Sequence, residues 1–208
     1  MSASRRTALC LLAAASLGGC MSLPAADPKV DAELSVYTLR PSLPDKPAGR
    51  AGAMVVVDKP TLPAGFPRDR VSLLFEPDHR VDYYADAKWA APLDELLQQF
   101  VIGVGRARLT GKTVDAPDAS KPARYRLAVK LTDFAPVYQG TPDGVPRLDV
   151  AMVVTVFALP QNTVRKEIVV KKSAQASENR LGVIVDGLQT LLQTATDEAL
   201  RETAPYLK

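Results

Sequence analysis

Few residues of this chain are of a type that does chemistry. Its 208 residues include one histidine, His79, and two cysteines, Cys10 and Cys20. A Ser-His-Asp triad needs a histidine beside its nucleophile, but His79 follows a Pro-Asp turn, and no G-x-S-x-G or S-x-x-K pattern occurs. One histidine and no run of closely spaced oxygen ligands also disfavour zinc and calcium sites. The sequence therefore predicts a protein that is not an enzyme and that uses no metal or cofactor.

Two other patterns with a superficial likeness to chemical motifs have plainer explanations. The stretch "GVGRAR" (103–108) lacks a third glycine and follows a predicted helix, whereas a phosphate loop precedes one. Asp94 and Glu95 are neighbours on that helix and do not face each other. Two acids far apart in the sequence would still suffice for glycoside hydrolysis. A hydrolase of the cell envelope therefore stays an alternative function. It predicts turnover that is lost when specific acids or His79 are changed.

Cys20 is the one reactive residue with an informative setting. Arg5 and Arg6 precede the apolar run "TALCLLAAASL", which is shorter than the roughly 20 residues of a membrane span and is typical of a signal peptide. The stretch Leu17-Gly18-Gly19-Cys20 resembles the lipobox of bacterial lipoproteins, in which the cysteine is acylated before cleavage. We expect residues 1–19 to be a lipoprotein signal peptide and Cys20 to carry the lipid.

The lipid anchor predicts a location. Two or more acyl chains hold a protein stably on a membrane, whereas one chain does not. Met21 and Ser22 follow the cysteine, and neither is the aspartate that retains enterobacterial lipoproteins in the inner membrane. The periplasmic face of the outer membrane is therefore expected, with residues 20–33 forming the lipidated cysteine and a flexible tether.

The charge balance excludes a nucleic-acid partner. The chain has 26 Lys and Arg against 23 Asp and Glu, but Arg5 and Arg6 leave with the signal peptide and no acid does. The remaining chain is almost balanced and shows no cluster of excess basic residues. Its length is that of one domain with a sizeable core, which we place at 34–208.

Hydrophobic periodicity predicts the elements of that domain. Runs of β type and period-2 alternation indicate strands, and 3-4 spacing of apolar residues indicates amphipathic helices. The expected strands are 34–40, 53–59, 71–76, 79–84, 124–134, 147–159 and 162–175, and the expected helices are 88–109 and 178–203. Residues 110–123 are expected to form a loop. The fold class is α+β: a mostly antiparallel sheet, ending in a three-stranded meander, with two amphipathic helices packed on one face.

The start and end of the first helix carry specific expectations. Pro92 suits the first turn of a helix, where its missing N–H costs nothing. Gly103 and Gly105 indicate that the helix loosens or ends there.

Aromatic residues cluster at the junction between the strand 79–84 and this helix. Tyr83, Tyr84 and Trp89 allow two interpretations. Trp89 is the first core anchor of the helix, or the junction forms a partner-binding surface, where Tyr and Trp are enriched. On the second interpretation the candidate partner-binding residues are Tyr83, Tyr84, Trp89, Pro92 and Leu93.

Several stretches together resemble the ABC-type transport auxiliary lipoprotein family, the paraquat-inducible protein C-like group. They are the lipobox, Tyr37-Thr38-Leu39, Val55-Val56-Val57 before Leu62-Pro63, the Tyr83-Tyr84 pair, "KWAAPLDELL", "YRLAVKLTDF" and the amphipathic C-terminal helix. The resemblance covers nearly all of the chain after Cys20. Its most specific part is Trp89-Ala90-x-Pro92-Leu93, although Lys88 and Ala91 stand where the family often has Arg and Glu.

The resemblance implies a noncatalytic periplasmic part of a lipid transport system that contains MCE-domain (mammalian cell entry) proteins. The implied partners are an MCE protein of an inner-membrane transporter, the membrane through the N-terminal lipid, and further copies of the chain in a homo-oligomer. A second hypothesis is a periplasmic lipid carrier, which needs a closed apolar cavity. The two helices have just enough apolar surface to cover one sheet, so the sequence favours docking over carrying.

Overall fold

The long strand β6 (Tyr125–Gln139) organises the domain. It has β7 (Arg147–Ala158) on one edge, and β8 (Thr163–Gln175) continues the sheet beyond β7. Both ladders are antiparallel, twelve residue pairs each, which confirms the predicted meander. The structure, a computed structural model, describes residues 34–43 and 52–208. The predicted signal peptide, Cys20 and the tether to residue 33 lie outside the described residues.

The other edge of β6 receives strands from the N-terminal half. These strands are β1 (Ser35–Tyr37), β2 (Met54–Val57), β3 (Arg70–Glu76), β4 (Arg80–Trp89) and β5 (Thr113–Asp115), and the sheet order is β1-β4-β3-β6-β2-β5. Strand β5 was not predicted, because three residues within a polar loop carry no periodic signal. The turn at Pro77-Asp78 between β3 and β4 is confirmed.

The α+β class is confirmed, but the sheet is mixed and not mostly antiparallel. Among the described residues, four of the seven ladders are parallel: β1–β4, β2–β5, β2–β6 and β3–β6. Strands β2 and β3 reach β6 by crossovers and therefore run in its direction, whereas hairpins produce the antiparallel ladders. Each parallel ladder holds three residue pairs, whereas each of the two ladders of the meander holds twelve.

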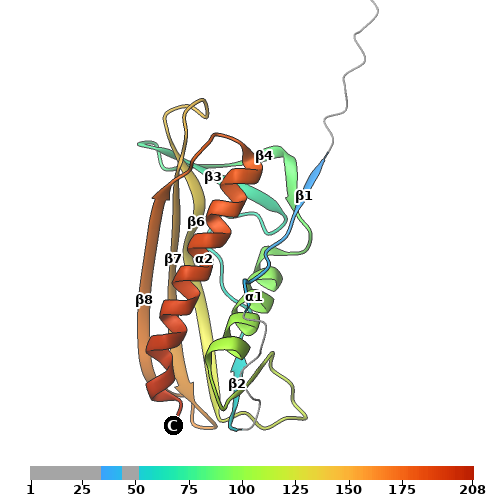
Figure 1. Cartoon of the computed structure of the whole chain (residues 1–208), viewed down its shortest axis with the longest axis vertical. Helices are drawn as coiled ribbons and strands as arrows, with labels where there is room; N and C mark the ends of the chain where they lie inside the picture. Colours follow the sequence, from blue (N-terminus) through green and yellow to red (C-terminus); the bar gives the residue numbers. More distant parts are fainter. Residues whose placement is uncertain (1–33, 44–51) are drawn as a thin grey trace, which may run out of the picture. The chain divides into compact units, whose positions relative to one another are not determined.

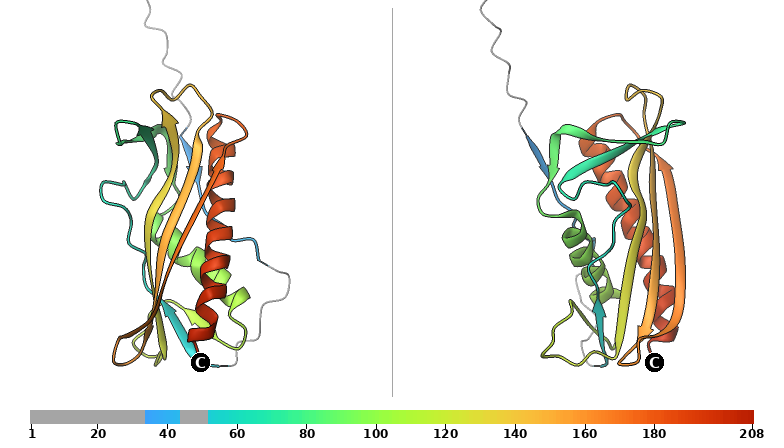
Figure 2. Two further views of the ribbon diagram at one scale, coloured as in Figure 1. Left: turned by 90° about the vertical axis from the view of Figure 1, so that its left-hand side faces the viewer. Right: turned by 180° about the vertical axis from the view of Figure 1, so that it is seen from behind.

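The helix α2 (Leu181–Thr203) lies along the meander and contacts all three of its strands (Figure 1). The helix α1 (Leu93–Arg108) contacts α2, β2 and β5, and a 3-10 turn, η1 (Ala204–Tyr206), follows α2. Seen from behind (Figure 2, right), β7 and β8 lie in front of α2 with no helix over them. Among the described residues, no helix is long and apolar enough to cross a membrane.

One large core joins both helices to the sheet. Alternate residues of β6, Tyr125, Leu127, Val129 and Leu131, are buried in it as predicted. They meet the apolar face of α2, which includes Leu188 and Leu192 at 1% exposure or less. Burying side chains of this size stabilises a fold by about 1.5–3 kcal/mol each before entropic costs.

The glycines of α1 do not end the helix, contrary to the prediction. A Cβ on Gly103 would lie 2.8 Å from the Pro41 side chain, and one on Gly105 would lie 3.0 Å from Val114. The two glycines therefore allow close packing of the N-terminal segment and of β5 against α1. The helix continues past both of them to Arg108.

Candidate functional site

The hairpin of β3 and β4 contains the aromatic residues singled out from the sequence. Its register shifts between Arg70, which pairs with Lys88, and Ser72, which pairs with Tyr83. The extra residues of β4 bend the strand. Strand β1 pairs with β4 only from Ala87 onward. Among the described residues, Arg80–Tyr83 therefore pair with β3 on one side and have no strand partner on the other.

Tyr83 lies on the exposed side of this free edge. Its side chain is 51% exposed, and the guanidinium carbon of Arg70 lies 5.5 Å from the centre of its ring. A nitrogen of the same guanidinium donates a hydrogen bond to the backbone oxygen of Ala85 at 2.9 Å. A cation over an aromatic ring contributes about 0.5–1 kcal/mol at exposed sites. The ring is thus held in place while much of its surface stays open.

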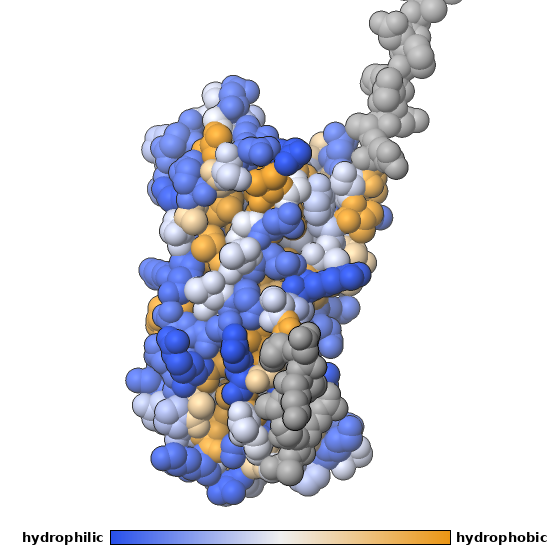
Figure 3. All heavy atoms as spheres, viewed as in Figure 1, coloured by the Kyte–Doolittle hydropathy of each residue, from blue (hydrophilic) through white to orange (hydrophobic). Residues whose placement is uncertain are grey.

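Other apolar side chains lie along the same edge of the sheet. Val81 of β4 is 38% exposed, and Val36 of β1, which pairs with Lys88, is 55% exposed. Leu34 is 45% exposed. We call Leu34, Val36, Val81 and Tyr83 the edge patch. Hydrophobic surface is visible where β1 enters the domain (Figure 3).

Tyr84 points inward, unlike its neighbour. Its hydroxyl oxygen lies 2.7 Å from that of Tyr138, and the Tyr138 hydroxyl donates to Asn179 Oδ1 at 2.8 Å. Burial, with the hydrogen bond to Tyr138, raises the pKa of Tyr84 far above its ordinary value, and burial also raises the pKa of Tyr138. Asn179 donates in turn to the backbone oxygen of Pro142. This network fastens β4 to β6 and to the segment before α2.

The remaining candidates divide between core and surface. Trp89 is 4% exposed, and its ring centre lies 6.1 Å from that of Phe134. It ends β4, whereas the sequence pattern placed it in the helix, which begins at Leu93. Leu93 is 2% exposed, while Pro92, the N-cap residue, is exposed. In this conformation Tyr83 and Pro92 can touch a partner directly, and Trp89 and Leu93 hold the junction from within.

The proline-rich loop between β2 and β3 is fastened to the start of α1. Arg68 donates two hydrogen bonds to the carboxylate of Asp94, that from Nε to Oδ1 being 3.1 Å long. The backbone oxygen of Arg68 accepts from the N–H of Leu93 at 2.7 Å. Burial raises the pKa of Asp94, but the hydrogen bond and charge of Arg68 outweigh burial and hold it below its ordinary value.

We expect Asp94→Asn to lower the free energy of unfolding at pH 7 by about 1–2 kcal/mol, because it removes the charge from a buried carboxylate that accepts charge-assisted hydrogen bonds from an exposed arginine. A carboxyl group whose pKa is lower in the folded than in the unfolded chain stabilises the fold at pH values above its unfolded pKa of about 3.9. This stabilisation is lost as the pH falls through the pKa of the folded chain. The difference from the unmodified protein should therefore shrink as the pH falls below about 4. Urea unfolding at several pH values measures it.

The control for this prediction is Glu95→Gln. Glu95 accepts from Lys59 at 2.9 Å, but both side chains are nearly half exposed. Such surface pairs are worth about 0–1 kcal/mol. An equal loss from both substitutions would contradict the role given to Asp94.

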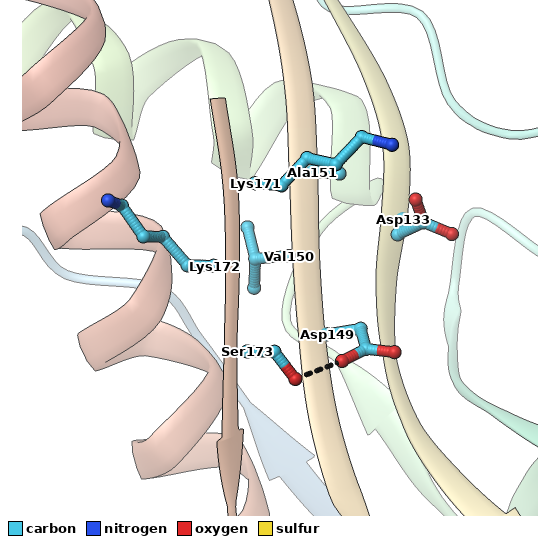
Figure 4. Close-up of a pocket in the computed structure, with 7 residues that line it drawn as sticks. All are labelled: Asp133, Asp149, Val150, Ala151, Lys171, Lys172 and Ser173. Atoms are coloured by element: carbon cyan, nitrogen blue, oxygen red, sulfur yellow. Dashed lines mark hydrogen bonds between the residues drawn. The ribbon is translucent and has the colours of Figure 1, made fainter. Parts of the chain in front are cut away.

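A depression of about 320 Å³, lined by both charged and apolar residues, lies over the meander (Figure 4). Asp149 accepts from the Ser173 hydroxyl at 2.6 Å and from Arg147 at 2.9 Å. Burial raises the pKa of Asp149, but these partners outweigh burial and lower it. Asp133 and Lys171 also line the depression. A general acid needs a raised carboxyl pKa, so this arrangement fits ionic contacts better than acid–base catalysis.

His79 lies in the turn between β3 and β4 with a backbone φ of 52°, and it is exposed. Within the described part of the chain, no group of three His, Cys, Asp or Glu residues could hold a metal ion.

The sequence did not identify Leu34, Val36 or Val81 as candidate residues. Leu34 and Val36 lie beside and within the three-residue strand β1, and Val81 lies in β4. Whether such a residue lies on an exposed edge depends on which strands pair. Arg70 has no sequence signal either, because it meets Tyr83 across the β3–β4 ladder.

The described part of the chain has an exposed strand edge at β4 and no recognisable catalytic constellation. The chain belongs to the ABC-type transport auxiliary lipoprotein component family, whose model matches residues 37–199. Membership places it among the lipid-anchored proteins of the cell envelope.

Solved structures show the same fold. A Xanthomonas campestris protein of the DUF330 family is 17% identical, with a TM-score of 0.65, covering 83% of this chain and 94% of its own. An uncharacterised protein of known structure is 18% identical, with a TM-score of 0.64 and coverages of 82% and 98%. Among curated proteins, none matches this chain in sequence.

Proposed function

We propose that this chain is a noncatalytic docking subunit of an ABC-type transport system that contains MCE-domain proteins and moves lipids across the envelope. It would be anchored through Cys20 to the periplasmic face of the outer membrane, where it receives the far end of the periplasmic assembly. Membership of the transport auxiliary lipoprotein family supports this role.

The observation that carries the docking role is the edge patch. Tyr is enriched at interaction hot spots because it offers a large apolar surface with a polar end. Tyr83 is half exposed, is held by Arg70, and borders a strand edge that has no strand partner. Its own N–H donates to the side chain of Asp82 at this edge. Such an edge can accept an extended segment of a partner as an added strand, while Val81 and Tyr83 contact its side chains.

A lipid carrier has weaker support. The apolar groove between α2 and the ends of β7 and β8, about 360 Å³, is lined by residues such as Leu148, Val183 and Leu191. Figure 1 shows α2 running along the outside of the meander. Sites for small ligands span roughly 300–1,000 Å³ and enclose most of the ligand. This groove is at the small end of that range and open, which favours docking.

We expect Tyr83→Ala to reduce recovery of the partner by about tenfold or more, since hot-spot truncations cost about 2 kcal/mol or above. The melting temperature should stay nearly unchanged, because Tyr83 is outside the core. Affinity capture of the partner from crosslinked membranes, with a parallel thermal melt, measures both.

Tyr206 provides the matched control. It is 39% exposed, and Lys166 Nζ lies 5.8 Å from its ring centre, but it lies in η1 after α2. Tyr206→Ala should leave capture unchanged. Equal effects of the two substitutions, or no effect of Tyr83→Ala, would remove the edge patch from the docking surface.

A further inference from the structure

The strand β8 ends the meander with a long unpaired edge. It is 13 residues long, and among the described residues it pairs only with β7. Val164 and Val169 of this strand are 56% and 59% exposed. An edge of this length presents a row of free N–H and C=O groups to which another strand can pair.

Two charged residues of β8 are placed symmetrically about Val169, and their charges are opposite in sign. Glu167 and Lys171 stand two residues on either side of it. We propose that β8 pairs antiparallel with β8 of a second copy of this chain, with Val169 on the two-fold axis. Glu167 of each copy then stands opposite Lys171 of the other, so the interface contains two cross-strand pairs of opposite charge, which stabilise a sheet.

The same register aligns apolar residues. Val169 pairs with Val153 within the chain, so the joined sheet places Val153 and Val169 of both copies in one row on its uncovered face. On the helix side, Ile168 faces Val170 of the second copy, and both are 2% exposed under α2 already. The register therefore continues the valine row and the existing core across the axis.

Two pairs of like charges remain, because Lys166 of each copy stands opposite Lys172 of the other. Lys172 already binds Glu198 at 2.5 Å, and Lys166 lies over the ring of Tyr206. Each ammonium thus has a partner in its own chain on the helix side. Charged residues on a strand edge also prevent strand pairing in other proteins. The positions of Glu167 and Lys171 favour pairing here, because the proposed register places each Glu167 opposite a Lys171 of the second copy.

Cysteine crosslinking of the full-length lipidated protein in native membranes tests this proposal. Val169→Cys places two thiols across an antiparallel pair, whose Cα separation of about 4.5–5.5 Å suits a disulfide. Mild oxidation should give a disulfide-linked dimer on a non-reducing gel. Val164→Cys is the control, because Val164 is about as exposed as Val169. In this register Val164 of the second copy lies about 33 Å away, so the Val164→Cys protein should stay monomeric.

Charge reversal tests the register. Lys171→Glu in the Val169→Cys background should lower the dimer yield, and adding Glu167→Lys should restore it. Three results would overturn the proposal: no dimer with Val169→Cys, equal dimer with both cysteines, or a yield insensitive to Lys171→Glu. These outcomes are independent of the docking role, because β8 and the edge patch belong to different edges of the sheet.

Discussion

Replacing Trp89 with alanine is expected to lower the free energy of unfolding by about 3–5 kcal/mol. Trp89 is 4% exposed and packs beside Phe134 between the end of β4 and the start of α1. Removing its ring leaves a cavity where β4, β6 and α1 meet, and the neighbouring elements can close it only in part. Urea unfolding followed by circular dichroism measures the loss.

A second substitution separates packing from hydrogen bonding. Trp89 Nε1 is buried without a hydrogen-bond partner, so Trp89→Phe removes an unsatisfied donor while keeping an aromatic ring. It should cost clearly less than Trp89→Ala, because it leaves a smaller cavity and relieves the unpaired N–H. An unchanged melting temperature for Trp89→Ala, together with lost partner binding, would contradict the core role and place Trp89 in the interface.

The second large effect is expected from Cys20→Ala, which should move the protein from the membrane fraction to the soluble fraction. The acyl chains on Cys20 are the predicted attachment to the membrane, and an alanine at this position cannot carry them. Fractionation and immunoblotting measure the distribution. Cys10→Ala is the control, because Cys10 belongs to the predicted signal peptide and its loss should leave attachment intact. A Cys20→Ala protein that stays firmly membrane-bound would contradict the anchor.

The long elements were predictable because their periodicity extends over many residues. Strand β6 alternates cleanly from Tyr125 to Leu131, and α2 repeats its apolar face over its whole length, so their types and faces were correct. The direction of pairing at β2 and β3 was not predictable. Three-residue ladders depend on how the crossovers place the strands, and local sequence does not encode this.

The candidate site was predictable as a region but not in its orientation. Tyr83 and Tyr84 are adjacent, and the sequence does not tell which of them faces outward. The register shift opposite Arg70 and Ser72 decides it by bringing Tyr84, Ala87 and Trp89 inward. Strand β4 also continues beyond Tyr84 to Trp89. The sequence did not predict this, because the apolar residues from Trp89 onward have helical spacing.

The most direct test of the docking role is a crosslinked pull-down of the lipidated protein from native membranes, with mass spectrometry of the recovered proteins. Recovery of an MCE-domain protein, reduced by Tyr83→Ala and unaffected by Tyr206→Ala, is the predicted result. Recovery of other outer-membrane components without any MCE-domain protein would contradict the proposed function, while leaving the fold and the family unchanged.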